Sequence, residues 1–94
     1  MHVEHDTLAH RFVAQVSSGT AVLTYAAAGP GLLELYSTFV PAPDRGRGVG
    51  GRLVEAALGY AREQGMRVIP TCSYVAQWIG EHPENADLLA IRGR

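Results

Sequence analysis

The chain has 94 residues, of which 47% are apolar and 18% are charged, and its formal net charge is −1. This length fits one small domain that buries roughly 60–65% of its unfolded surface, and the near-neutral charge excludes the basic field that holds nucleic acid. No apolar run approaches the ~18 residues of a membrane span, no secretion signal is visible, and the single cysteine, Cys72, cannot form an intrachain disulfide. We therefore expect one domain over residues 1–94, in the cytoplasm, with a small-molecule ligand and no nucleic-acid or membrane partner.

The first half of the chain predicts three strands. Residues 11–16 and 20–25 are rich in β-branched and aromatic residues, and the turn sequence SSG between them indicates an antiparallel hairpin. After the turn signal AAGPG, residues 32–40 carry apolar side chains at both alternating sets of positions. That pattern predicts a central strand covered on both sides.

The second half predicts helices around one further strand. Apolar residues recur at helical spacing over 49–64, and MRVIP at 66–70 predicts a buried strand parallel to the third, because strand, helix and strand form a crossover unit. A shorter helix is expected over 73–82 and a last helical segment over 83–90, where a proline suits the first turn. The tail at 91–94 is expected to be frayed.

The segment PDRGRGVGG, residues 43–51, joins the third strand to the main helix and places four glycines beside two arginines. Backbone N–H groups at a helix N-terminus favour an anion, so phosphate is the natural ligand. The Gly-Lys-Ser/Thr end of a P-loop is absent. Gly46, Gly48 and Gly51 formally match the dinucleotide pattern G-x-G-x-x-G, but the strand lies too far from the first glycine and no acidic residue follows the next strand. A third pattern, Arg/Gln-x-x-Gly-x-Gly/Ala, is met by Arg45, Gly48 and Gly50.

This third pattern and the residues around it resemble the GCN5-related N-acetyltransferase superfamily. Residues 38–89, with Pro-x-Cys-Ser-Tyr-Val at 70–75, are similar to a small single-domain subgroup of N-acetyltransferase-like proteins. The subgroup often has an Asp-His-Thr-like triplet where this chain has Tyr36, Ser37 and Thr38. The resemblance implies an abbreviated α/β (α+β) fold, with a mixed sheet of antiparallel N-terminal strands, a β-α-β crossover after the glycine loop and short C-terminal helices.

The resemblance also implies the site residues. In the superfamily, main chain at the end of the central strand, here Phe39 and Val40, pairs with the pantetheine arm and thioester of acetyl-CoA. The strand with Val68 and Ile69 would part from Val40 to admit the acyl group. The loop would hold the pyrophosphate of coenzyme A through Arg45, Gly46, Arg47, Gly48, Val49, Gly50 and Gly51.

Two candidate catalytic residues, Cys72 and Tyr74, follow the strand that parts. A tyrosine near this place in several superfamily enzymes protonates the departing CoA thiolate, and Tyr74 is the candidate for that general acid. The expected activity is acetyl transfer from acetyl-CoA to an amine of unknown identity by direct attack. Covalent transfer through Cys72, whose pKa a helix N-terminus could lower, is one alternative.

Two further alternatives involve no catalysis. The chain could be a non-catalytic acyl-CoA-binding or sensing module, or the glycine loop could be a purely structural turn without CoA affinity. A chain of this length has little room for elements that wall the acceptor site. We therefore expect that the acceptor cleft is open, or that a protein partner or a second copy in a homodimer completes it.

Other residues are given smaller roles. Glu34 is a candidate general base, although a charged residue on a strand is more often solvated. Three N-terminal histidines, His2, His5 and His10, lack the spacing of a metal site, so we expect them to be exposed and predict no metal.

Overall fold

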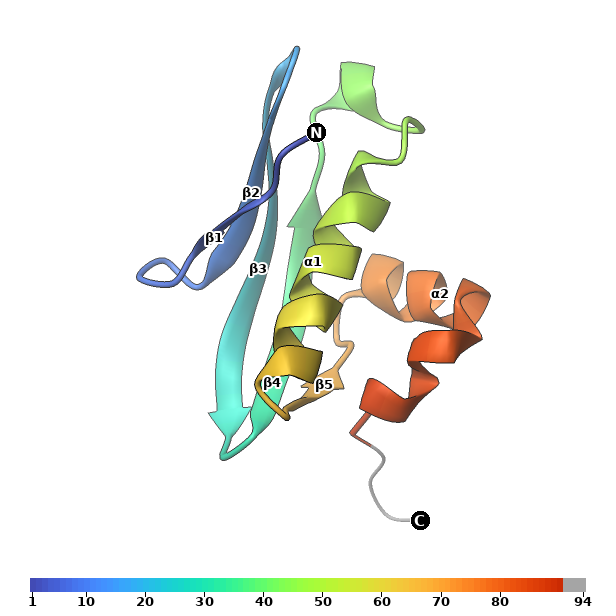
Figure 1. Cartoon of the computed structure of the whole chain (residues 1–94). Helices are drawn as coiled ribbons and strands as arrows, with labels where there is room; N and C mark the ends of the chain where they lie inside the picture. The colour runs from blue at the N-terminus through green and yellow to red at the C-terminus, as the bar shows by residue number, and fades with distance from the viewer. Residues whose placement is uncertain (91–94) are drawn as a thin grey trace.

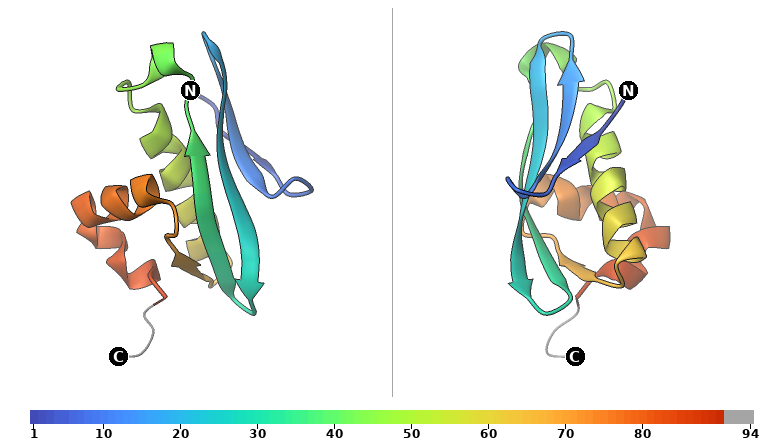
Figure 2. Two further views of the ribbon diagram at one scale, coloured as in Figure 1. Left: turned by 180° about the vertical axis from the view of Figure 1, so that it is seen from behind. Right: turned by 60° about the vertical axis from the view of Figure 1, so that its left-hand side comes forward.

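The structure is a computed structural model that describes residues 1–90, and it contains a five-stranded sheet with its helices on one side (Figures 1 and 2). Strands β1 to β4 are successive antiparallel neighbours, and β5 pairs parallel with β4. The predicted mixed sheet is therefore confirmed, whereas the tail at 91–94 lies outside the described residues. In chain order the elements, with η for a 3-10 helix, are β1 (Glu4–Asp6), β2 (Arg11–Val16), β3 (Gly19–Gly29), β4 (Leu32–Phe39), η1 (Ala42–Asp44), α1 (Val49–Glu63), β5 (Arg67–Ile69), α2 (Ser73–Glu81) and η2 (Pro83–Leu88).

The core lies between the sheet and α1. Alternate residues of the strands face the helix, since a strand repeats every two residues, and α1 meets them with one face of its 3.6-residue period. Val75 and Ile79 attach α2 to the same core. The buried residues at the centre are Ala21, Leu23 and Tyr25 of β3, Leu33 and Leu35 of β4, and Leu53, Val54, Ala57, Leu58 and Ala61 of α1. Among residues 1–90, no helix is both long and apolar enough to cross a membrane.

The prediction that β4 is covered on both sides is wrong. Both α1 and α2 lie on one side of the sheet, and the view from behind shows the other side uncovered over residues 1–90 (Figure 2). Leu33 and Leu35 are buried, but Tyr36 and Phe39 are 46% and 52% exposed. A register shift opposite Thr24 and Tyr25 of β3 also interrupts the alternation of β4 at Tyr36. Apolar residues on both faces thus did not require a second layer.

Two segments extend the sheet beyond the prediction. The short strand β1 pairs with residues 11–13 of β2, although its sequence, EHD, carries no β signal. Strand β3 runs to Gly29, because its small residues pair with β4, so only Pro30 and Gly31 remain of the expected AAGPG turn.

His5 is not the exposed residue that the sequence suggested. Its ring stacks on Phe12 at a centroid distance of 4.2 Å, and its Nε2 lies 2.5 Å from the hydroxyl of Tyr25. Burial in this aromatic cluster lowers the pKa of His5 below its usual value. His2 and His10 are exposed, as expected.

Candidate functional site

Strands β4 and β5 part after a short ladder. They pair only from Leu32 with Arg67 to Glu34 with Ile69, and the Cys72 amide then donates to the Leu35 carbonyl at 2.9 Å. In the described part of the chain, the rest of β4 has no strand beside it on this edge. The expected parting of the two strands is confirmed, and it leaves backbone that an extended ligand could pair with.

The loop after β4 presents open backbone at the start of α1. Gly46 and Gly48 both have φ near +80°, which favours glycine, and a Cβ built on either would meet nothing within 4 Å. Gly48 is the N-cap of α1, and its carbonyl accepts the first helical hydrogen bond from Arg52 at 3.2 Å. The first-turn N–H groups of α1 therefore have no partner within the helix.

A cavity of about 390 Å³ lies where these features meet. Its volume is in the range of small-molecule sites. Of the predicted site residues, Arg47, Gly51 and Cys72 do not line it. Its lining comes from the end of β4, the loop, the first turn of α1 and one side chain of α2: Thr38, Phe39, Val40, Asp44, Arg45, Gly46, Gly48, Val49, Gly50 and Tyr74.

Two glycines of the loop sequence have a packing role that sequence reasoning missed. A Cβ on Gly50 would lie 2.7 Å from the hydroxyl oxygen of Tyr74, and a Cβ on Gly51 would lie 2.9 Å from Nε1 of Trp78. A side chain at either position would displace an aromatic ring, because aromatic side chains of α2 rest on the start of α1. A glycine needed for packing and a glycine needed for phosphate contact look the same in a sequence.

Tyr74 combines contact with α1 and access to the cavity. Its side chain is 42% exposed, and its ring covers Gly50 at the cavity wall. Burial of part of the ring raises the pKa of Tyr74, and the nearby Glu81 and Cys72 raise it further. The phenol is thus protonated at neutral pH, which is the form that a general acid needs.

Cys72 lies beside the cavity at the parting of the strands. It is the N-cap of α2, and its thiol is 3.5 Å from the Thr38 hydroxyl oxygen. Burial alone would raise the pKa of Cys72, but the neighbouring Thr38 and the first-turn amides of α2 favour the thiolate and lower the pKa overall. This direction agrees with the expectation for a thiol at a helix N-terminus.

Arg45 is tied to the end of β4. Its Nε donates to the Val40 carbonyl at 2.7 Å, and its guanidinium lies 5.9 Å from the centroid of the Phe39 ring. The arginine therefore adds positive charge at the cavity wall without a partner carboxylate on its Nε.

Glu34, the candidate general base, accepts a hydrogen bond from the Thr71 hydroxyl at 2.6 Å and does not line the cavity.

Sequence reasoning also missed Asp44, although it stands inside the quoted loop segment. Its side chain is only 6% exposed and belongs to the cavity lining. A carboxylate next to arginines is usually solvated, and its partners lie far away in the sequence, so the sequence carried no signal for it.

Comparison with known proteins agrees with this geometry. A family model for the GCN5-related N-acetyl-transferase matches residues 11–88. The chain is 34% identical over 85 residues to Protein NATD1 of Bos taurus and 33% identical to that of Homo sapiens, covering in each case 88% of this chain and 75% of the relative. The solution structure of a GCN5-like protein from Staphylococcus aureus has the same fold, with a TM-score of 0.73 at 18% identity over 99% of this chain and 91% of the other. The chain thus belongs to the GCN5-related N-acetyltransferase family.

Proposed function

We propose that this protein binds acetyl-CoA in the cavity between β4, the glycine loop and Tyr74, and transfers the acetyl group to an amine. The observation that carries the proposal is the convergence of three groups on one cavity: the unpaired edge of β4, the open backbone of the loop and the Tyr74 hydroxyl. Membership of an N-acetyltransferase family supports acetyl transfer as the reaction.

The pyrophosphate of coenzyme A would lie on the loop. Open space above Gly46 and Gly48 lets phosphate oxygens reach the first-turn N–H groups of α1. The helix dipole stabilises a negative charge there by about 0.3–1 kcal/mol, and by up to about 2 kcal/mol when the site is partly buried. Arg45 adds positive charge from the cavity wall, and Arg47, which does not line the cavity, would act by steering the anion.

The thioester would lie at the end of β4. The thioester oxygen is an acceptor and needs a donor, so the Val40 N–H is the main-chain group that would hold it, while the Val40 carbonyl accepts from Arg45. An amine would attack the carbonyl carbon directly, the bond to sulfur would break, and Tyr74 would donate its proton to the CoA sulfur. The proton lost by the amine nitrogen would pass to solvent, and solvent would reprotonate Tyr74. In this proposal Tyr74 is a catalytic residue, because it lines the cavity in which the reacting atoms would lie.

Covalent transfer through Cys72 is a second candidate mechanism. Its lowered pKa and its position at the parting of β4 and β5 favour a nucleophilic thiolate. Direct attack is preferred because Tyr74 lines the cavity and Cys72 does not. The proposed location is the cytoplasm, where a free thiol stays reduced, and the acceptor site is either open or completed by a partner protein or second copy.

Calorimetric titration with acetyl-CoA and CoA tests the proposal. We expect micromolar binding by the wild-type protein, loss of binding in Gly48→Glu, and retained binding in the matched control Gly59→Glu, where α1 has open space. Absence of wild-type binding at millimolar ligand would refute the proposed function. Binding without acetylation of any amine in a substrate panel would instead identify a non-catalytic module, and an acetyl mass on Cys72 would identify the covalent route.

A further inference from the structure

Asp44 is the only buried charged side chain among residues 1–90. Its carboxylate reaches across to the turn between β2 and β3, 26 and 27 residues earlier in the chain. The Ser17 hydroxyl donates to Oδ1 at 3.3 Å, the Ser18 amide donates to Oδ2 at 3.1 Å, and the Ser18 hydroxyl also donates to Oδ2. Both carboxylate oxygens are therefore engaged by the hairpin turn.

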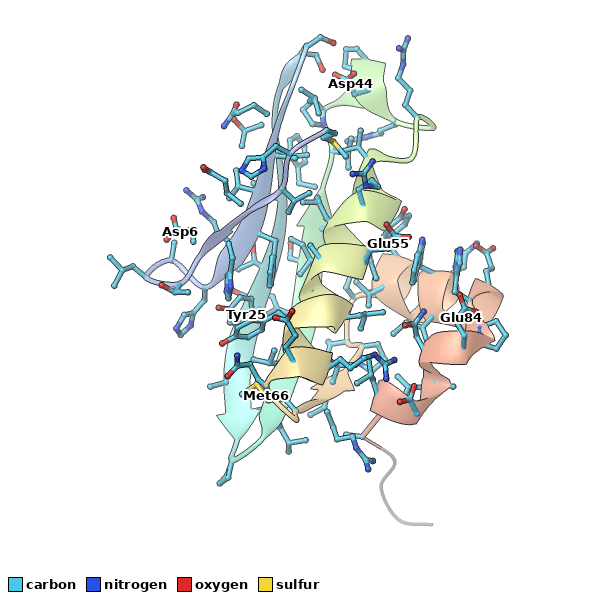
Figure 3. The ribbon with its side chains drawn as sticks, viewed as in Figure 1. Asp6, Tyr25, Asp44, Glu55, Met66 and Glu84 are labelled. Atoms are coloured by element: carbon cyan, nitrogen blue, oxygen red, sulfur yellow. The ribbon has the colours of Figure 1, made fainter. Side chains whose placement is uncertain are left out.

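The turn between β2 and β3 also packs against η1. A Cβ on Gly19 would lie 3.4 Å from Cγ of Pro41, so the turn backbone lies close to the start of η1. The η1 segment is itself closed by a hydrogen bond from the Asp44 amide to the Pro41 carbonyl at 2.9 Å. Figure 3 shows Asp44 at the end of the molecule where the β2–β3 hairpin meets η1. The residues just before the glycine loop are thus held by a distant part of the sheet.

The glycine loop consequently runs between two fixed ends. At one end Asp44 is bound to the hairpin turn and Arg45 to the Val40 carbonyl. At the other end α1 begins after Gly48 and is packed into the core. Glycine-rich segments lose much conformational entropy when they are ordered, so fixing both ends reduces the ordering that a ligand must impose.

We propose that Asp44 is a positioning residue, whose hydrogen bonds to the β2–β3 turn hold the glycine loop so that its backbone N–H groups face the pyrophosphate of coenzyme A. This inference rests on the proposed function. Asp44 does not act by touching the phosphates, because a carboxylate repels them and its oxygens are engaged by Ser17 and Ser18. Its effect reaches the ligand through the loop backbone.

A ligand without a pyrophosphate separates this role from a general effect on the fold. S-acetylpantetheine carries the thioester and the whole pantetheine arm but lacks the nucleotide and its phosphates. We expect Asp44→Ala to raise KM for acetyl-CoA roughly tenfold with kcat changed less than about twofold. With S-acetylpantetheine, kcat/KM should change less than about twofold.

Matched variants distinguish hydrogen bonding from charge. Asp44→Asn keeps an oxygen that can accept from Ser18, so it should restore KM for acetyl-CoA to within about twofold of wild type. Ser18→Ala removes one donor and should shift KM in the same direction as Asp44→Ala. Asp87→Ala is the control, because that carboxylate ties α1 to η2 through Arg62 at 2.8 and 3.2 Å and does not line the cavity, and it should leave KM unchanged.

Wild-type binding of CoA is measured first and tests the proposed function independently of Asp44. If wild type binds CoA and Asp44→Ala binds it equally well, the positioning role is overturned. Equal losses with acetyl-CoA and with S-acetylpantetheine would also overturn it, since they indicate a general structural effect. If Asp44→Ala does not fold, Ser18→Ala answers the same question with the same two substrates.

Discussion

Replacing Gly50 by alanine tests how the start of α1 and the Tyr74 ring fit together. The new Cβ would lie 2.7 Å from the Tyr74 hydroxyl oxygen, 2.8 Å from Cζ and 2.9 Å from Cε2. Real Cβ atoms do not approach other heavy atoms so closely, and the backbone of α1 is fixed by the core. The Tyr74 ring must therefore move off the cavity wall.

The expected effects on stability and on catalysis differ in size. Overpacking costs roughly 1–3 kcal/mol in a core, but Tyr74 is 42% exposed and can turn toward solvent, so the low end applies. Alanine in place of glycine within a helix stabilises by up to about 1 kcal/mol. The free energy of unfolding should thus change by less than about 1 kcal/mol. Displacing a general acid should lower kcat by about 10²- to 10⁴-fold.

Thermal unfolding and acetyl-transfer kinetics of Gly50→Ala measure the two effects. Gly59→Ala is the control on the same helix, because a Cβ there meets nothing within 4 Å, and it should keep full activity. The double variant Gly50→Ala with Tyr74→Phe should be no slower than the slower single variant, since both changes remove the same proton donor. Full kcat in Gly50→Ala would show that the Tyr74 hydroxyl plays no part at this position.

Three other predictions follow from the same structure. Tyr74→Phe should lower kcat about 10²- to 10⁴-fold. Because the pKa of Tyr74 is raised, the rate of the wild-type enzyme should fall only above the ordinary pKa of tyrosine, and Tyr74→Phe should abolish this alkaline fall. An unchanged pH–rate profile in Tyr74→Phe would show that Tyr74 takes no part in the mechanism. The pH dependence of Cys72 alkylation by iodoacetamide should give an apparent pKa below that of an ordinary thiol, and Thr38→Val should raise that pKa. Cys72→Ala should keep acetyl transfer if the amine attacks directly. Complete loss of acetyl transfer in Cys72→Ala would favour the covalent route. Because folding lowers the pKa of His5, the folded state should lose stability as the pH falls below about 6.5, the ordinary histidine value. Between pH 7.5 and 5.5, Tm should therefore drop less in His5→Phe than in the wild-type protein. An equal drop in both proteins would refute this link between His5 protonation and stability.

Much of the fold could be predicted because local patterns dominate it. The helical spacing after the glycine loop placed α1, and the strand–helix–strand order fixed β5 parallel to β4. The partial cover of β4 could not be predicted, because alternation shows which faces are apolar and not which elements are available to cover them. The strand pairing of His5 with Phe12 was equally hidden, since a three-residue edge strand has no pattern of its own.

The sequence by itself determined the family, the loop before α1 and the candidate residues at the end of β4, because these depend on residue types at short, fixed spacings. Only the tertiary structure decided what surrounds them. Tyr74 lines the cavity while Cys72 lies beside it. The ring of Tyr74 also packs against Gly50, which lies 24 positions earlier in the chain. Asp44 is held by a hairpin turn that precedes it by more than two dozen residues. Such contacts join segments far apart in the chain, so they arise only when the sheet and helices pack together.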